Sequence, residues 1–267
     1  MKLIQQLEYG GNCLKVIDYL KSIFNDVSYT CETYQSFPSA EIMGVKQSGL
    51  QMIYKSIFTI NQKNTSICLN LSDSMLAAME MSSFGVLSMH IPQIITSTLV
   101  NKNDYNIEWV FDKNKPEGIF QYLEFDGFCQ DVINHYENAF DIKADFITKY
   151  KNSPVANEVG VGGGEKIYSA LLNFKHENKN YGLKLCDTIA SAKNNINTYD
   201  PSALLFYKNS SNPLFAIKDD DENVLQNIFA KLSVGAKLNK PLTKDENGII
   251  HGNLIDKYGV CWDISLS

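Results

Sequence analysis

The pattern of hydrophobic and polar positions at the start of the chain predicts a strand, an amphipathic helix and then further strands. Residues 3–9 form the first strand, which a pair of glycines ends. Five hydrophobic residues between 16 and 24 then fall on one face of a helix. A β-branched and aromatic run over 27–34 is typical of a strand, and a polar turn joins the strand-like runs 52–60 and 66–71 into a hairpin. The predicted order is β-α-β-β-β.

The same order recurs further along the chain. One copy combines a helix over 131–140 with strands over 122–125, 146–149, 167–174 and 182–185. The last copy has a helix from the acidic residues 219–221 to about 233, with strands over 214–217, 238–242, 249–255 and 260–265. Residues 85–111 hold a weaker copy, with strands over 85–91 and 107–111 and a short helix over 94–100. We therefore expect four modules, the second of them eroded.

Two stretches of the chain are nearly repeated. The sequence QQLEYGGNC over 5–13 returns as QYLEFDGFC over 121–129, and residues 53–73 match residues 167–187. Two matched blocks in the same order indicate a duplicated domain. The polar stretch 113–118, with its proline and glycine, is the predicted boundary. It divides the chain into domains over 1–118 and 119–267.

Composition and charge limit the classes of partner. Hydrophobic residues make up 44% of the 267 residues and charged residues 20%, which is typical of a soluble globular protein. The formal net charge of −6 argues against a nucleic-acid partner, which requires a basic face. The six cysteines show no CxxC spacing and are expected to be reduced thiols. With no signal peptide and no long apolar run, we expect a cytoplasmic protein without membrane contact.

Several motifs resemble the vicinal oxygen chelate superfamily, which includes glyoxalase I and bleomycin-resistance proteins. The paired β-α-β-β-β modules are typical of it. The turn Gly11-Asn12-Cys13, the matching segment ending at Cys129, and HGNLIDKYGVCWD over 251–263 resemble the PhnB-like branch, although Lys257 replaces its usual proline. The resemblance implies an α+β fold of tandem glyoxalase-like domains, each with paired modules that curl a sheet into a cup.

The resemblance also implies positions for metal ligands on the first and last strands of each module. These positions fall at Gln5 and Gln121 on first strands and at Asp263 on the last strand. Gln121 and Asp263 are oxygen donors that suit a divalent metal, which would polarise a substrate oxygen. The remaining positions fall near Lys184 or Cys186 and near Asn212 or Leu214, where a lysine would oppose a cation and a leucine provides no ligand. His251 could be a general base, a ligand, or simply a histidine at the rim.

The glycine run over 159–166 lacks the Gly-Lys-Ser/Thr ending of a phosphate-binding loop and predicts a hairpin loop that could cover a cup. Three functional hypotheses remain open. The chain binds a small molecule in the second-half cup, or it is a metal-dependent lyase, isomerase or dioxygenase, or it is a structural pseudo-dimer without activity. Homodimer formation is possible in each case.

Overall fold

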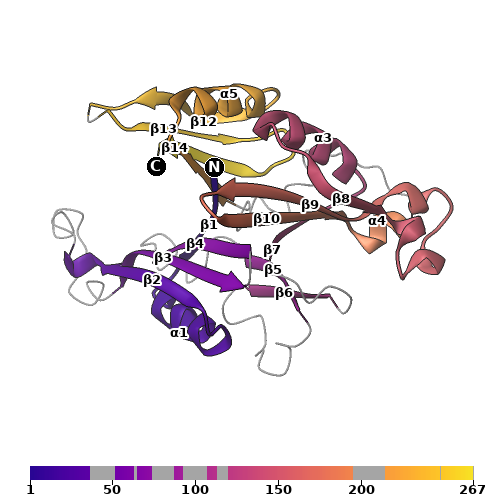
Figure 1. Cartoon of the computed structure of the whole chain (residues 1–267), viewed down its shortest axis with the longest axis horizontal. Coiled ribbons are helices and arrows are strands. Elements are labelled where there is room, and N and C mark those ends of the chain that lie inside the picture. The colour runs from indigo at the N-terminus through magenta and orange to yellow at the C-terminus, as the bar shows by residue number, and fades with distance from the viewer. Residues whose placement is uncertain are drawn as a thin grey trace.

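A computed structural model of the chain shows an α+β fold in which helices cover the outer faces of a large, strongly curved sheet (Figure 1). It describes residues 1–36, 52–62, 65–73, 87–92, 107–112, 120–194, 214–246 and 248–266. In Figure 1, α3 and α5 lie along one side of the molecule and α1 lies along the other. No helix within these ranges is long and apolar enough to cross a membrane.

The first module contains the predicted β-α-β-β-β order. Its sheet runs β2-β3-β4-β1, with β1 parallel to β4 and the other neighbours antiparallel. The amphipathic helix α1 buries Cys13, Val16, Ile17 and Leu20 against this sheet. The elements are β1 (Lys2–Tyr9), α1 (Cys13–Ile23), β2 (Val27–Thr33), the 3₁₀ turn η1 (Tyr34–Ser36), β3 (Ile53–Gln62) and β4 (Thr65–Asp73).

The third and fourth modules repeat this arrangement, and two parallel strands of the second module are described. The predicted strands and helices of the modules are confirmed, apart from the helix over 94–100, which lies outside the described residues. The second-module strands are β5 (Leu87–Pro92) and β6 (Ile107–Asp112). The third module comprises β7 (Phe120–Phe125), α3 (Cys129–Phe140), β8 (Ala144–Lys149), β9 (Ile167–His176) and β10 (Lys179–Asp187). The fourth comprises β11 (Leu214–Asp219), α5 (Glu222–Leu232), β12 (Lys237–Lys244), β13 (Ile250–Ile255) and β14 (Cys261–Leu266).

The modules pair across the chain. Strand β1 of the first module pairs antiparallel with β11 of the last module, and β5 pairs antiparallel with β7. One sheet therefore combines the first and fourth modules, in the order β2-β3-β4-β1-β11-β14-β13-β12, and a second combines the other two. A single bridge between Thr65 and Asn180 connects the sheets. The sequence predicted pairing within each half, whereas the observed pairing crosses the predicted boundary; residues 113–118 themselves lie outside the described residues.

A shared aromatic core joins the third and fourth modules. The ring of Trp262 on β14 contacts Tyr136 and Phe140 on α3, with ring centroids 5.4 and 5.1 Å apart. Phe215 on β11 and Phe174 on β9 complete the cluster. Burying large aromatic side chains is a major source of folding stability. The helices α3 and α5 are therefore held to one continuous core rather than to separate domains.

The duplicated sequence encodes a duplicated hydrogen-bond network. The Asp73 carboxylate accepts backbone N–H groups of Gly11, Cys13 and Ile53 at 2.8–3.0 Å. Asp187 accepts the equivalent groups of Cys129 and Ile167 at 2.9 and 2.8 Å. Each carboxylate ties the last strand of its module to the start of the helix and to the hairpin. The matched positions are thus explained by architecture.

The glycine run packs against a short helix that the sequence did not predict. Three 3₁₀ turns precede β9: η5 (Tyr150–Asn152), η6 (Ala156–Glu158) and η7 (Gly163–Glu165). The last of them, η7, contacts α4 (Ile189–Asn194), which follows β10. A Cβ atom at Gly163 would lie 1.7 Å from the Ala192 carbonyl oxygen, so this close approach requires glycine.

Candidate functional site

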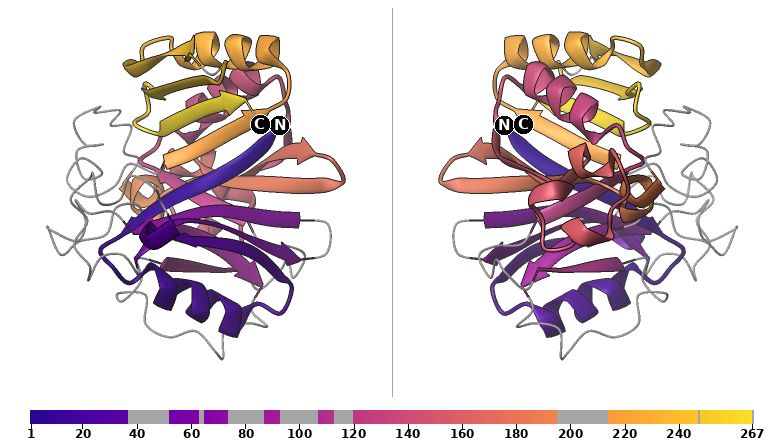
Figure 2. Two further views of the ribbon diagram at one scale, coloured as in Figure 1. Left: turned by 90° about the vertical axis from the view of Figure 1, so that its left-hand side faces the viewer. Right: turned by 90° about the vertical axis from the view of Figure 1, so that its right-hand side faces the viewer.

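The face of β13 and β14 that points away from α5 is lined by polar residues. Side chains alternate between the two faces of a strand, so Trp262 and Ile264 point to the α5 core while Asp263 points the other way. On β13, His251 and Asn253 share this second face, because a Cβ at Gly252 between them would meet Phe229 of α5. Figure 2 (left) looks onto the sheet of the first and fourth modules, with α5 above and α1 below.

His251 and Asp263 form a hydrogen-bonded pair on this face. The His251 Nε2 lies 3.0 Å from Oδ1 and 3.1 Å from Oδ2 of Asp263. The other ring nitrogen, Nδ1, lies 2.9 Å from the Nζ of Lys240 on β12. The side chains of His251 and Asp263 are 33% and 21% exposed, so both are accessible to a small molecule. Because the Lys240 ammonium donates to Nδ1, the ring proton lies on Nε2 and is donated to the Asp263 carboxylate. These two hydrogen bonds fix the tautomer and the orientation of the ring.

A buried carboxylate holds the hairpin that carries the pair. Asp256, in the turn between β13 and β14, accepts the Tyr136 hydroxyl at 2.7 Å and the Trp262 indole N–H at 2.9 Å. It also accepts the backbone N–H groups of Tyr258 and Val260 at 2.8 and 3.0 Å. Asp256 is 4% exposed, and burial raises its pKa although the hydrogen bonds oppose the shift. The segment over 251–263 is therefore a hairpin held by a buried turn, with His251 at one end and Asp263 at the other.

The strand register extends the face into the first module. Asp263 is the Cα partner of Ala216 on β11, which is in turn the partner of Ile4 on β1. The next row contains Ser265, Lys218 and Lys2. Cα partners in a sheet point to the same side. The face thus depends on strands from both ends of the chain.

The two glutamines at the predicted ligand positions lie elsewhere. Gln121 on β7 is 2% exposed, and its Nε2 donates to the Cys68 carbonyl oxygen at 3.5 Å. Its Cα partner is Leu183, which belongs to the core beneath α3. Gln5 is likewise buried and is the partner of Phe215. The structure therefore brings His251 and Asp263 together and places Gln121 on the other sheet, on the helix-covered face.

The donors in this region make an incomplete metal site. Within the described ranges, no group of three or more His, Cys, Asp or Glu side chains is close enough to hold a metal ion. His251 and Asp263 provide one nitrogen and one carboxylate, and a protein zinc site has three or four protein ligands. Cys261, whose Sγ lies 3.7 Å from Asn253 Nδ2, stays protonated because burial raises its pKa. The residues described here do not fit a divalent metal on their own.

The second sheet has a polar cluster on the face that points away from α3. The Tyr122 hydroxyl lies 2.7 Å from the Cys186 sulfur and 3.2 Å from the Glu124 carboxylate. Lys184 lies over the rings of Phe120 and Phe146. Burial raises the pKa values of Tyr122 and Cys186, so both remain protonated at neutral pH. This cluster could not be predicted from the sequence, because Glu124 and Cys186 lie 62 positions apart on two paired strands.

A pocket of about 530 Å³ lies on the outer surface between α3 and the β13–β14 turn. His135 lines it, together with Tyr258, and the His135 Nε2 is buried without a hydrogen-bond partner. Burial and the nearby Lys257 lower the pKa of His135 to about 4. The imidazole is therefore neutral at physiological pH. This residue lies on α3, within the helix predicted over 131–140.

Comparison with solved structures identifies the architecture. A point mutant of glyoxalase I from Zea mays aligns over 98% of this chain and 92% of its own, with a TM-score of 0.60 and 12% sequence identity. The unmodified maize enzyme aligns over 98% and 90%, with a TM-score of 0.54 and 12% identity. The protein has the glyoxalase fold. The fold extends over nearly the whole chain.

Shorter solved structures align with about half of the chain. A PhnB protein from Bacillus cereus, described as a putative 3-demethylubiquinone-9 3-methyltransferase, aligns over 55% of this chain and 96% of its own, with 21% identity and a TM-score of 0.37. No protein-family profile and no curated protein sequence matches the chain. At these identities the likeness establishes the fold alone.

Proposed function

We propose that the protein binds a small molecule on the face of the sheet shared by its first and fourth modules, and that His251 and Asp263 contact it. The observation that carries this proposal is the partly exposed His251–Asp263 pair on the sheet face opposite α5. A sheet face that packs on no helix, with a few converging polar groups, is a common setting for ligand binding. The location of this face, on the sheet that the first and fourth modules of the glyoxalase fold share, also supports the proposal.

The pair offers specific chemistry to a ligand. The Asp263 carboxylate accepts the hydrogen bond of His251 and has further lone pairs that can accept hydrogen bonds from a ligand. Asn253, the Cα partner of Asp263, adds an amide that both donates and accepts. These groups suit a polar ligand.

The other two hypotheses receive less support from the geometry. A metal-dependent reaction would need further ligands beside His251 and Asp263, and Gln121 lies on the other sheet. If the first half served only as support, the candidate face would be complete in its absence. Instead, strand β1 of the first half forms part of that face. Membership of the PhnB-like branch stays a prediction that rests on the motifs.

A thermal-shift screen of small polar compounds tests the proposal. Compounds that raise the melting temperature of the wild-type protein are measured again on His251→Gln, Asp263→Asn and, as a matched control, His135→Gln, each against its own ligand-free value. We expect the shift to disappear in the first two variants and to persist in the control. Loss of the shift in His135→Gln alone would move the site to the outer pocket, and a screen without any binder would reject the proposal.

A further inference from the structure

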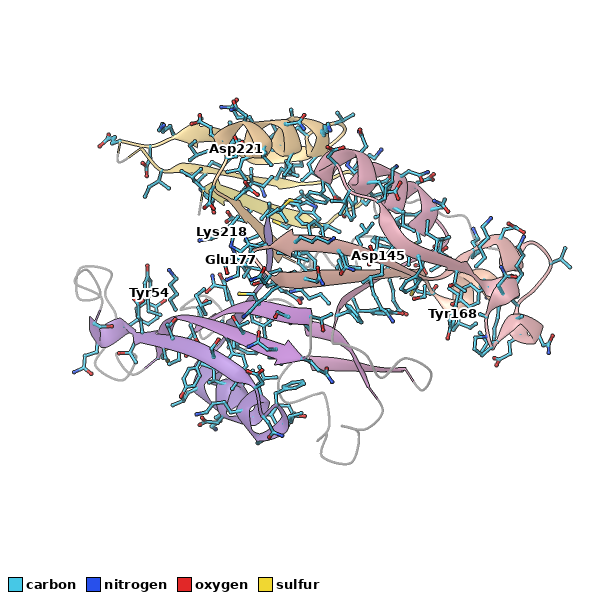
Figure 3. All side chains as sticks on the ribbon, in the orientation of Figure 1. Tyr54, Asp145, Tyr168, Glu177, Lys218 and Asp221 are labelled. Atoms are coloured by element: carbon cyan, nitrogen blue, oxygen red, sulfur yellow. The ribbon has the colours of Figure 1, made fainter. Side chains whose placement is uncertain are left out.

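We propose that the ligand of this face is a small anion whose carboxylate or phosphate oxygens are bound by Lys218 and Lys2. This inference rests on the proposed function, because it assigns the ligand class of the same face. The two lysines are direct Cα partners on β11 and β1 (Lys218 is labelled in Figure 3). Both belong to the strand positions that share the face of Asp263.

The two ammonium groups have no counter-ion among the described residues. Both side chains are half-buried, and no described carboxylate lies within 4 Å of either Nζ. Asp219 is next to Lys218 in the chain, but it points to the opposite side of the sheet and pairs with the Met1 amino group at 2.9 Å. Glu177, from the β9–β10 turn, is labelled near Lys218 in Figure 3, yet no ion pair joins the two.

Like charges directly opposite each other on paired strands are destabilising. Two half-buried lysines in that position therefore reduce the stability of the ligand-free sheet. A bound anion would neutralise the repulsion and would gain charge-assisted hydrogen bonds from both ammonium groups. Positions that break a local rule of stability are commonly functional.

The neighbouring residues continue the positive charge toward the His251–Asp263 pair. Ser265 is the Cα partner of both Lys218 and His251, so a hydroxyl lies between a lysine and the imidazole. Lys240 adds a further ammonium beside His251. The only acid in these rows is Asp263, and His251 already pairs with it. Although the chain has a net charge of −6, this local row of positive charge attracts anions.

The strand spacing sets the size of the ligand. Lys218 and His251 are separated by two strand intervals, or roughly 10 Å. An anion of a few carbon atoms bound at the lysines can place a second polar group near Ser265 or His251. A dicarboxylate or a phosphorylated small molecule meets this description.

The test uses succinate and inorganic phosphate as probes, with neutral succinamide and sodium chloride of matched ionic strength as controls. At ten times the dissociation constant, we expect each anion to raise the melting temperature of the wild-type protein by about 2 °C. In Lys218→Gln and Lys2→Gln, we expect a higher ligand-free melting temperature, because the repulsion is removed, and at least a tenfold loss of anion affinity. Lys15→Gln, on the exposed surface of α1, should behave as the wild type.

Two results would overturn the inference. One is an anion-dependent shift that persists in both lysine variants, and the other is a ligand-free melting temperature that falls in them. The proposed function is judged separately. If a neutral compound binds in a way that requires His251 but not Lys218, the anion inference is rejected while the proposed function stands; if no compound binds, both are rejected.

Discussion

Replacement of Asp256 by alanine should destabilise the protein more than any single change at the candidate face. The carboxylate is 4% exposed and accepts four hydrogen bonds, two of them from the side chains of Tyr136 and Trp262. Removing it leaves both side-chain donors in the core without a partner. An unsatisfied buried donor costs about 1–3 kcal/mol, so these two alone give roughly 4 kcal/mol.

The loss can be measured by urea or thermal unfolding. For a chain of this length, about 4 kcal/mol corresponds to a fall in melting temperature of about 7 °C. Asp256→Asn should be intermediate, because the amide keeps one acceptor oxygen but turns an N–H₂ group toward two of the donors. The matched control is Asp220→Asn, an exposed aspartate before α5, for which we expect a change within about 0.5 kcal/mol. A loss of less than about 1 kcal/mol for Asp256→Ala would refute the network as the support of the hairpin.

Four further predictions follow from the structure. Gly163→Ala should detach η7 from α4 and speed proteolytic cleavage near 160–166, whereas Gly164→Ala, with its nearest contact at 3.2 Å, should change cleavage little. Native alkylation followed by mass spectrometry should label the exposed Cys31 first and leave Cys13, Cys68, Cys129 and Cys186 unmodified until unfolding. Because the folded pKa of His135 is lowered to about 4, its contribution to stability is complete above the unfolded value of about 6.5 and is lost as the pH falls toward 4; His135→Gln should remove this acid-dependent loss from a series of urea titrations. A fragment over 119–267 should fold poorly or aggregate, because it exposes the edge of β11 that β1 covers, and a soluble fragment with native stability would contradict the pairing.

The modules could be predicted from the sequence because their signals are local. Period-two runs, an amphipathic helix and a polar turn recur with little change, and the strands β1 to β4 begin and end within a few residues of the expected positions. The pairing of modules could not be predicted in the same way. It depends on the contact of β1 with β11 more than 200 residues away, and no local pattern specifies which edge strand is the partner.

In the candidate site, too, the short-range contact could be predicted and the long-range placement could not. His251 and Asp263 are 12 residues apart on one antiparallel hairpin, so their contact follows from a short-range prediction. Gln121 was assigned by analogy to a first-strand position. A shift of one residue along a strand moves a side chain to the other face, and Gln121 points into the core while its neighbour Tyr122 points to the opposite face.

The pairing of Lys2 with Lys218 could not be predicted, for a different reason. Lys2 and Lys218 lie at opposite ends of the sequence, and each alone resembles an ordinary surface lysine. Only the register of β1 against β11 makes them neighbours. The overall negative charge of the chain also conceals a local positive row, since net charge contains no information on position.

The most direct test of a ligand site at His251 is a two-dimensional NMR spectrum of the histidine side chains. The chain has four histidines, and His251→Gln assigns one of the signals. On titration with a compound from the thermal-shift screen, we predict that the His251 signals shift in proportion to occupancy while those of His135, in the outer pocket, stay unchanged. Shifts at His135 with an unaffected His251 would contradict a binding site on the shared sheet.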